Sequence, residues 1–236
     1  MQDDNVNLEE QAKEWIKQNK RILIDKFANL QAFPGVINPF TIFMAGSPGA
    51  GKTEFSKSFI SAYPDADTKI VRIDADEIRD LIPGYNGQNA YRVQGAAALG
   101  VEKLFDYIQE HKQNAIVDGT FADYDIARDN IMRTLKRGRK VGIFYLYQDP
   151  RVAWEYTKIR EIKEKRHVSK EMFINSFFAA KDNVNKIKEE FGDEIELSLV
   201  IKDYTNKLQK TKFKIDKVDN YIKVEYTKED LNALLT

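Results

Sequence analysis

The sequence predicts an α/β fold in which a mainly parallel β-sheet carries helices on both faces. Short apolar runs alternate along the chain with longer segments of helical periodicity, which is the order of βαβ units. The chain has 236 residues, of which 42% are hydrophobic and 31% charged, so it can bury a sizeable core. We find no internal repeat and no linker. We therefore predict a single domain over residues 1–236.

The N-terminal segment, residues 1–38, is predicted to be largely helical. Apolar side chains within Leu8–Leu30 recur at helical spacing, and Pro34 and Pro39 then break the pattern. The next element is a strand, Thr41–Ala45, because this short apolar run ends at a glycine-rich turn.

The alternation continues beyond this first strand. The predicted elements are a helix at Lys52–Ala62, a strand at Ile70–Ile73, a helix at Asn89–His111, a strand at Ala115–Val117, a helix at Tyr124–Arg137, a strand at Lys140–Tyr147, helices at Pro150–Lys165 and Glu171–Phe191, and a strand at Glu194–Ile201. Because crossovers between parallel strands are right-handed, this order places helices on both faces of one sheet.

The C-terminal segment, residues 204–236, has a different pattern. Apolar and polar residues alternate over Lys212–Tyr226, with Asp219-Asn220 as a turn, which predicts a small hairpin. A short helix is predicted to follow it. We expect both to be appended to the α/β core.

Composition excludes several classes of protein. Basic and acidic residues number 37 each, so the net charge is zero, and a partner that binds through bulk electrostatics, such as nucleic acid, is disfavoured. The absence of cysteine excludes disulfides, cysteine-zinc sites and thiol nucleophiles. The N-terminus lacks the apolar core of a secretory signal, and no apolar run could span a bilayer. We therefore expect a cytoplasmic protein with no membrane partner.

A glycine-rich motif follows the first predicted strand. Its residues are Gly46, Ser47, Pro48, Gly49, Ala50, Gly51, Lys52 and Thr53, which match G-x-x-x-x-G-K-[ST]. Glycines let successive backbone amides point into one concavity, and the following helix adds its positive end. In such a loop Lys52 contacts the β- and γ-phosphates, and the Thr53 hydroxyl binds Mg²⁺. A turn that only caps a helix is the alternative, but the flanking strand and helix favour a P-loop.

Three carboxylates follow the second predicted strand. A P-loop kinase needs a carboxylate that accepts the proton of the acceptor hydroxyl, and the end of a strand beside the P-loop strand is a suitable place. We interpret Asp74 as a helix cap, with Glu77 three residues on, and Asp76 as the catalytic base. Compensation of the helix dipole is the alternative role for Asp76.

The third predicted strand ends in Asp118-Gly-Thr120. An acid at the end of an apolar strand is typical of the Mg²⁺ side or the acceptor side of a P-loop enzyme. The alternative is a turn that begins at Asp118, in which Thr120 forms a local hydrogen bond.

Two arginines, Arg160 and Arg166, follow the fourth predicted strand in a segment dense in both signs of charge. Arginines on a mobile element can neutralise the γ-phosphate during transfer. A solvated helix face with Glu–Lys pairs explains the same pattern equally well.

This set of motifs resembles the zeta toxin family of P-loop kinases. The resemblance rests on GSPGAGKT, IDAD after the second strand, VDGT after the third and two arginines after the fourth, and it extends to about Asp203. It implies a nucleoside-kinase-like sheet and transfer of the ATP γ-phosphate to a hydroxyl of a nucleotide sugar, best known as the 3′ position of UDP-N-acetylglucosamine. It also implies a small antitoxin protein as a possible partner.

The resemblance implies roles for residues that hold the nucleotide. Lys52 and Thr53 match the family's nucleotide-binding pair, and Asp76 matches its base. Arg160 matches an arginine that contacts the γ-phosphate, and Arg166 matches a second one.

The resemblance also implies acceptor residues. Asp118 and Thr120 match the substrate and magnesium region, so Asp118 is expected to join Thr53 as a Mg²⁺ ligand. Glu102 falls where the family places an acid that contacts the substrate, with an exposed helical glutamate as the alternative. The best-known members carry glutamate where this chain has Asp118. Two further segments, Gly84–Gly87 and Gly95–Ala98, are expected to shape the acceptor pocket.

We therefore predict a kinase that requires ATP and Mg²⁺ and phosphorylates a nucleotide sugar. One alternative is a P-loop kinase of another small-molecule or nucleic-acid acceptor, although the zero net charge disfavours polynucleotides. The other is a nucleotide-dependent binding protein, which would not need the acids on the acceptor side.

Overall fold

The computed structural model describes residues 2–63, 68–164, 167–203 and 208–236. Its strands are β1 (Phe40–Ala45), β2 (Ile70–Asp74), β3 (Asn114–Asp118), β4 (Lys140–Tyr147), β5 (Ile195–Asp203) and β6 (Leu208–Lys212). Its helices are α1 (Gln2–Gln18), α2 (Lys20–Phe27), α3 (Lys52–Ser61), α4 (Ala75–Arg79), α5 (Ala90–Glu110), α6 (Tyr124–Lys136), α7 (Pro150–Glu164), α8 (Lys170–Phe191) and α9 (Lys228–Leu234).

The six strands form one sheet in the order β2-β3-β1-β4-β5-β6. Strands β1 to β5 are parallel to one another, and β6 pairs with β5 in the antiparallel direction. This arrangement confirms the predicted fold class. The strand order places β1, which leads into the glycine-rich motif, between β3 and β4. The carboxyl ends of three neighbouring strands therefore meet at the motif.

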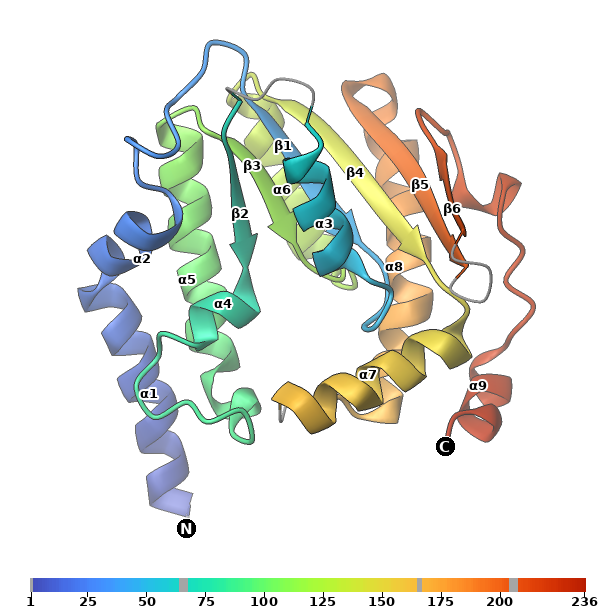
Figure 1. Cartoon of the computed structure of the whole chain (residues 1–236), viewed down its shortest axis with the longest axis horizontal. Helices are drawn as coiled ribbons and strands as arrows, with labels where there is room; N and C mark the ends of the chain where they lie inside the picture. The colour runs from blue at the N-terminus through green and yellow to red at the C-terminus, as the bar shows by residue number, and fades with distance from the viewer. Residues whose placement is uncertain (1, 64–67, 165–166, 204–207) are drawn as a thin grey trace.

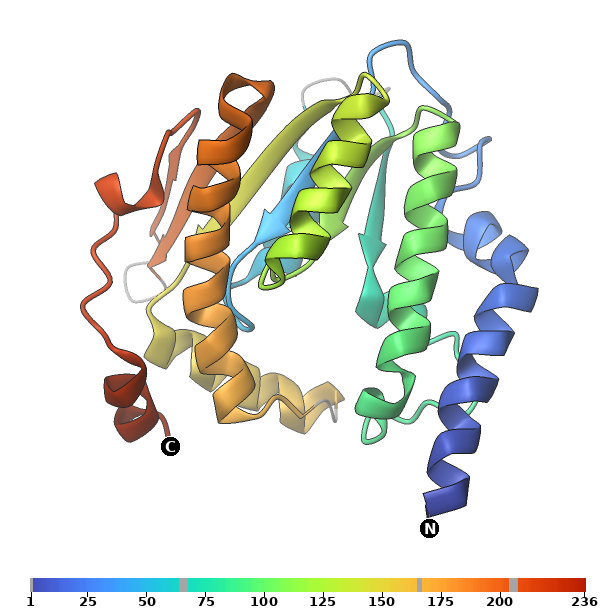
Figure 2. The ribbon, with the colours of Figure 1, turned by 180° about the vertical axis from the view of Figure 1, so that it is seen from behind.

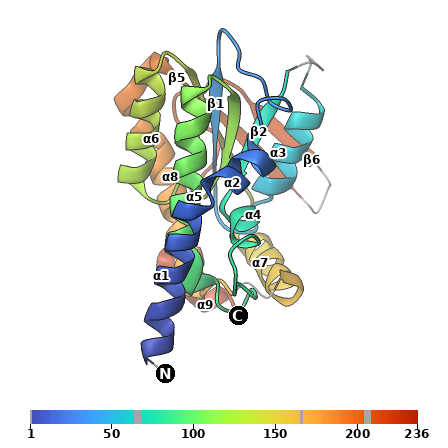
Figure 3. The ribbon, with the colours of Figure 1, turned by 90° about the vertical axis from the view of Figure 1, so that its left-hand side faces the viewer.

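Helices cover both faces of the sheet, as predicted. Helices α5, α6 and α8 lie on one face (Figure 2), and α3 lies on the other (Figure 1). Helix α7 runs across the end of the sheet toward which β1 to β4 point (Figure 1). The side view separates the two layers and shows α4 and α7 on the side of α3 (Figure 3).

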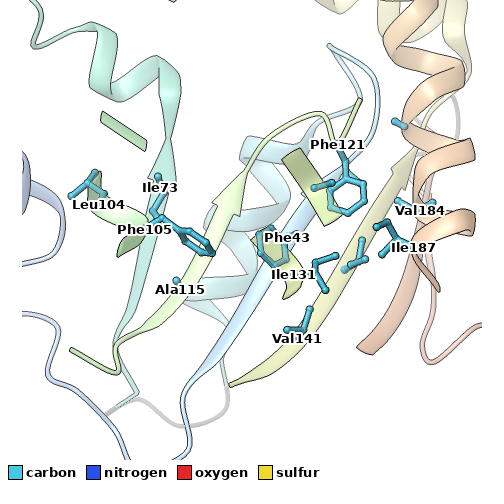
Figure 4. Packing of buried hydrophobic residues seen from close by; sticks show 14 of the residues in the cluster. Phe43, Ile73, Leu104, Phe105, Ala115, Phe121, Ile131, Val141, Val184 and Ile187 are labelled. Carbon is cyan, nitrogen blue, oxygen red and sulfur yellow. The ribbon is translucent and has the colours of Figure 1, made fainter. Parts of the chain in front are cut away.

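The main core lies between the sheet and the helices α5, α6 and α8. Phe43 on β1 packs edge-on against Phe105 of α5 and Phe121, with ring centroids 6.0 and 6.4 Å away (Figure 4). Ile131 on α6 and Val184 on α8 are fully buried in the same cluster. Burial of such side chains, at about 25 cal/mol per Å² of apolar surface, holds the parallel strands together.

The N-terminal segment is helical, as predicted, but it forms two helices with a break at Asn19. Helix α1 packs along α5 (Figures 2 and 3). The small residues of α5 allow this close approach, because a side chain at Gly95 would meet Lys13 at 2.8 Å and Ala96 is fully buried. The run Gly95–Ala98 therefore serves helix packing, and its expected place in an acceptor pocket is corrected.

The C-terminal segment corrects a second prediction. The antiparallel pair is formed by β5 and β6, whereas residues 213–226 contain no strand and the expected turn at Asp219-Asn220 is a 3-10 helix. Ile215, Val218 and Ile222 are nonetheless buried against the core. These three residues account for part of the apolar alternation without strand pairing, whereas Phe213 and Tyr221 are exposed. The predicted closing helix is confirmed as α9.

Among the residues that the structure describes, no helix combines the length and apolar character needed to cross a bilayer.

Candidate active site

The glycine-rich motif forms a loop between β1 and α3. Gly46, Gly49 and Gly51 have φ angles of +139°, +72° and +81°, which residues with a side chain rarely adopt. The amide of Gly46 donates to the carbonyl of Thr120 at 3.1 Å, which ties the loop to the end of β3. The Lys52 ammonium donates to the carbonyls of Gly46 and Ser47 at 2.9 and 2.7 Å, so it lies across the concave side of the loop.

Helix α7 packs directly against this loop. A Cβ at Gly49 would lie 2.0 Å from the carbonyl oxygen of Ala153 and 2.7 Å from the Thr157 hydroxyl, so only glycine permits the contact. Ala153 and Thr157 are both buried. The contact fixes the first turns of α7 on the loop, and Arg160 follows Thr157 by one turn.

A cavity of about 510 Å³ opens beside the loop, at the carboxyl ends of the strands. It is lined by Thr53, Lys57, Asp74, Asp76, Glu77, Asp80, Tyr85, Asn86, Gly87 and Arg160. One wall thus belongs to α3, another to α4 and the segment that follows it, and a third to α7. The residues of Gly84–Gly87 that were expected to shape the acceptor pocket do line this cavity, apart from Gly84.

A buried arginine, Arg72 on β2, holds the acids behind the cavity. Its guanidinium donates to Asp118 at 2.8 Å and to Glu77 at 2.6 Å, and it also bonds Asp74. Its Nε donates to the Ser56 hydroxyl on α3 at 3.0 Å. Arg72 therefore connects the P-loop helix, the end of β3 and the start of α4 through charge-assisted hydrogen bonds.

The carboxylates around Arg72 outnumber the cation. Burial raises the pKa of Asp74, and the charges of Asp76 and Asp118 raise it further, against the opposing effects of the Asp76 amide and Arg72. Burial alone would lower the pKa of Arg72, but its hydrogen bond to Asp118 and the charges of its acidic partners raise it. An ion pair would ordinarily lower the pKa of its carboxylate, and the pKa of Asp74 is raised because burial and the charges of Asp76 and Asp118 together outweigh the attraction of Arg72.

Helix α4 places Asp76 at the cavity. Asp74 caps this helix as predicted, since its side chain accepts the amide hydrogen of Asp76 at 2.8 Å, while Glu77 turns to Arg72 and completes no capping box. The Asp76 side chain is 29% exposed. One carboxylate oxygen bonds Arg79 and the other lies 3.5 Å from Arg160. Asp76 is thus both accessible and held between two arginines.

The structure brings three predicted site residues together, because Thr53, Asp76 and Arg160 line one cavity. Asp118 and Thr120 lie at the adjoining end of β3. Asp118 is 5% exposed and is held by Arg72, and Thr120 contacts the loop through its carbonyl.

Glu102 lies elsewhere. It is exposed on α5, does not line the cavity, and pairs with Arg133 on α6 at 3.9 Å. The turn of α5 that carries Glu102 faces α6, which is the position that the alternative of an exposed helical glutamate predicts. Arg166 lies outside the described residues.

Sequence reasoning missed several residues of the site. Lys57 lies one turn beyond Thr53 on α3, a spacing that could have indicated the same helix face. Asp80 and Tyr85 lie in the segment after α4, where no motif marks them. Arg72 and Arg79 resemble surface charges in the sequence, yet both are buried, and only the contacts of the folded chain reveal them.

Comparisons with known proteins agree with this geometry. The family model described as Zeta toxin matches residues 24–214. No sequence among curated proteins matches the chain.

Two solved structures illustrate the shared fold. One comes from a study of the PezAT chromosomal toxin-antitoxin system of Streptococcus pneumoniae, with 19% identity, a TM-score of 0.60, and coverage of 96% of this chain and 87% of that one. The other is an AvrRxo1-ORF1:-ORF2 structure with ATP, with 11% identity, a TM-score of 0.60, and coverage of 93% and 68%. At these identities the structures establish the fold alone. The family match spans well over half of the chain, so the protein belongs to the zeta toxin family.

Proposed function

We propose that this protein is a kinase that requires ATP and Mg²⁺ and transfers the γ-phosphate to a hydroxyl of a nucleotide sugar, UDP-N-acetylglucosamine being the proposed acceptor. The observation that carries the proposal is the single cavity lined by Thr53 of the P-loop, Asp76 and Arg160. It combines a triphosphate-binding element, a carboxylate and a cation, which are the parts that phosphoryl transfer requires.

Each of these residues has its own role in the proposed reaction. The amides of the glycine-rich loop and the Lys52 ammonium bind the β- and γ-phosphates. Asp76 orients the acceptor hydroxyl and accepts its proton as the oxygen–phosphorus bond forms. Arg160 neutralises the charge that spreads over the transferred phosphoryl group. Arg166 is proposed to assist it from the segment that follows α7.

The residues behind the cavity fit a magnesium ion. Asp74, Glu77 and Asp118 converge there on one arginine, Arg72, so a divalent cation would add positive charge beside several carboxylates. Thr53 would supply its hydroxyl, and Asp118, linked to the helix of Thr53 by a 3.4 Å hydrogen bond from Ser56, would supply a carboxylate. The ion would neutralise the β- and γ-phosphates during transfer.

The cavity also fits an acceptor that carries an anionic group. Lys57 lines its α3 wall, and Tyr85 and Asn86, which carry hydrogen-bonding groups, line the wall formed by the segment after α4. An ammonium is suited to a diphosphate, and the tyrosine and asparagine are suited to a sugar. The nucleotide-sugar acceptor is proposed on this chemistry and on the family, and Thr120 is proposed to contribute from the end of β3.

Membership of the family also leads us to propose an antitoxin as a partner. The Streptococcus pneumoniae structure described above comes from a toxin-antitoxin system. We propose that a small protein occludes the nucleotide site of this chain.

The test combines an acceptor panel with one variant. Incubation with ATP, Mg²⁺ and a set of UDP-sugars, followed by mass spectrometry, is expected to yield a phosphorylated UDP-N-acetylglucosamine. Asp76→Ala is expected to abolish transfer while nucleotide binding, measured by calorimetry, persists. Asp125→Ala is a matched control, because Asp125 also lies in the first turn of a helix but on α6. Rapid ATP hydrolysis without any phosphorylated product, or an Asp76→Ala protein with the full rate, contradicts the proposal.

A further inference from the structure

The two carboxylate oxygens of Asp76 have different neighbours. Oδ1 accepts a hydrogen bond from Nη1 of Arg79, one turn further along the same helix. Oδ2 lies 3.5 Å from Nη2 of Arg160, which lines the cavity. The oxygen on the cavity side is therefore Oδ2, and Arg79 holds the opposite one.

Arg79 is not placed to contact a substrate. The residue is 3% exposed and is absent from the lining of the cavity. Its Nη2 bonds the side-chain oxygen of Gln94 on α5, so the guanidinium bridges the Asp76 carboxylate and a long helix. A planar guanidinium with two donors engaged in different directions fixes the orientation of its partner better than a single ammonium does.

Arg79 is also incompletely satisfied. Its buried Nε has no hydrogen-bond partner within the described part of the chain. A buried donor without a partner costs about 1–3 kcal/mol, so the arginine is not optimised for stability alone. Buried polar groups without a hydrogen-bond partner occur in native proteins where the residue has a role other than stability, such as a role in catalysis.

An apolar contact of α4 also helps to fix the position of Asp76. Ile78 is 1% exposed and packs into the notch at Gly100 on α5, where a Cβ would lie 2.8 Å from Ile78 Cγ2. Helix α4 is thus docked on α5 by one apolar and one polar anchor. Because α4 has only five residues, these anchors determine where Asp76 lies.

We propose that Arg79 is a positioning residue for the kinase reaction: anchored by Gln94, it holds Oδ1 of Asp76 so that Oδ2 faces the acceptor hydroxyl. This inference rests on the proposed function. It assigns to Arg79 a role in the turnover step and none in binding ATP, because Arg79 reaches the reaction only through Asp76.

The test uses the full chain with ATP, Mg²⁺ and UDP-N-acetylglucosamine. Arg79→Lys is expected to lower kcat by about tenfold to hundredfold, because displacement of a catalytic group by about 1 Å has effects of that size. The KM for ATP and the affinity for ADP are expected to change less than twofold. Gln94→Leu, which keeps the arginine but removes its anchor, is expected to lower kcat in the same direction by a smaller factor.

Arg139 provides the matched control. It is equally buried, at 3%, but donates only to the Thr41 hydroxyl and to carbonyls such as Phe40 and Gln113, far from the cavity. Arg139→Lys is expected to lower the melting temperature by an amount similar to Arg79→Lys and to leave kcat per folded molecule unchanged.

Several outcomes overturn the inference. The inference is wrong if Arg79→Lys has the wild-type kcat. It is also wrong if kcat falls only in proportion to the unfolded fraction of the protein, or if kcat and ATP affinity fall together. If Arg79→Lys does not fold, an unchanged kcat in Gln94→Leu has the same consequence. Failure of the wild-type protein to phosphorylate any acceptor overturns the proposed function instead, so the two failures are distinguishable.

Discussion

The two sides of the candidate active site are built in different ways. The proposed nucleotide side is a contiguous stretch, Gly46–Thr53, whose shape comes from positive φ angles at three glycines. The proposed acceptor side gathers Asp76, Asp80, Tyr85 and Arg160 from α4, the segment after it and α7. The first depends on local backbone geometry, and the second on buried arginines that hold separate elements together.

Because of this difference, substitutions on the two sides should have different effects. A local loop fails when its backbone can no longer adopt the required angles, which changes nucleotide affinity directly. An assembled wall fails when a buried charge loses its partner, which changes the stability of the whole domain. Substitutions that act on only one side therefore test the comparison.

The largest effect is expected on the acceptor side, from Arg72→Met. Removing this cation leaves Asp74 and Asp118 buried beside each other without compensation, and breaking a buried ion pair costs about 3–5 kcal/mol. Urea unfolding followed by circular dichroism measures the loss. Arg128→Met is the control, because Arg128 pairs with Glu190 at 2.7 Å on the surface and should cost far less. Equal losses in the two variants contradict the proposed role of Arg72.

The next effect is expected on the nucleotide side, from Gly49→Ala. An alanine at this position would have to adopt a φ of +72°, and its Cβ would clash with the carbonyl of Ala153 on α7. We expect ATP affinity to fall by about tenfold to hundredfold, since a left-handed angle alone costs an alanine about 1–2 kcal/mol. Calorimetric titration with a non-hydrolysable ATP analogue measures it. Gly138→Ala is the control, because Gly138 also has a positive φ but open space around it. An equal loss of affinity in that variant would show that the effect is not local.

A smaller effect is expected from Lys57→Met on the wall that the two sides share. If Lys57 binds the diphosphate of the acceptor, its loss raises the KM for UDP-N-acetylglucosamine by about tenfold, since a hydrogen bond to a charged group contributes about 1.5–3 kcal/mol. Lys57→Arg should restore most of the affinity. Lys136→Met, an exposed lysine on α6, is the control. Steady-state kinetics measures the KM values for both substrates. An increase in the KM for ATP alone would assign Lys57 to the nucleotide side.

A pH effect is expected from Asp74→Asn. Because the folded protein raises the pKa of Asp74, it binds a proton that the unfolded chain has released, and the contribution of Asp74 to stability falls as pH rises through this interval. Asparagine caps a helix as well as aspartate and does not titrate. Unfolding free energies measured from about pH 4 to about pH 8 should therefore decline less in Asp74→Asn than in the wild type. A steeper decline in the variant would contradict the direction of the shift.

The sequence predicted the nucleotide side better than the acceptor side for a physical reason. A short apolar run that ends at a glycine-rich turn, such as Thr41–Ala45, is typical of a buried strand, and the spacing of glycines dictates the loop, so both can be recognised locally. Arg72 and Arg79 have no such local signature, because their burial depends on acids and amides that other elements bring to them.

The two corrected predictions have a similar origin. Residues 213–226 alternate because Ile215 and Ile222 are buried, and burial alone does not state whether the backbone pairs. The small residues Gly95–Ala98 were placed in a pocket, but small residues also allow helices to approach, as α1 does on α5. In both segments only some of the residues are buried, such as Ile215 and Ile222 in one and Ala96 in the other, and the tertiary structure decides what each of them packs against.

The smallest effect is expected from Glu102→Gln, which separates the two interpretations of α5. The family resemblance assigns Glu102 to the acceptor, whereas the structure places it beside Arg133 on α6, with a side chain 59% exposed. Because an exposed ion pair of 3.9 Å contributes little and Glu102 lies outside the cavity lining, kcat and the KM for UDP-N-acetylglucosamine should change less than about twofold. Asp80→Asn, which alters a carboxylate that does line the cavity, should change the acceptor KM more. A selective loss of acceptor affinity in Glu102→Gln would mean that α5 moves toward the acceptor during turnover, and the acceptor side would then be assembled only when substrate binds.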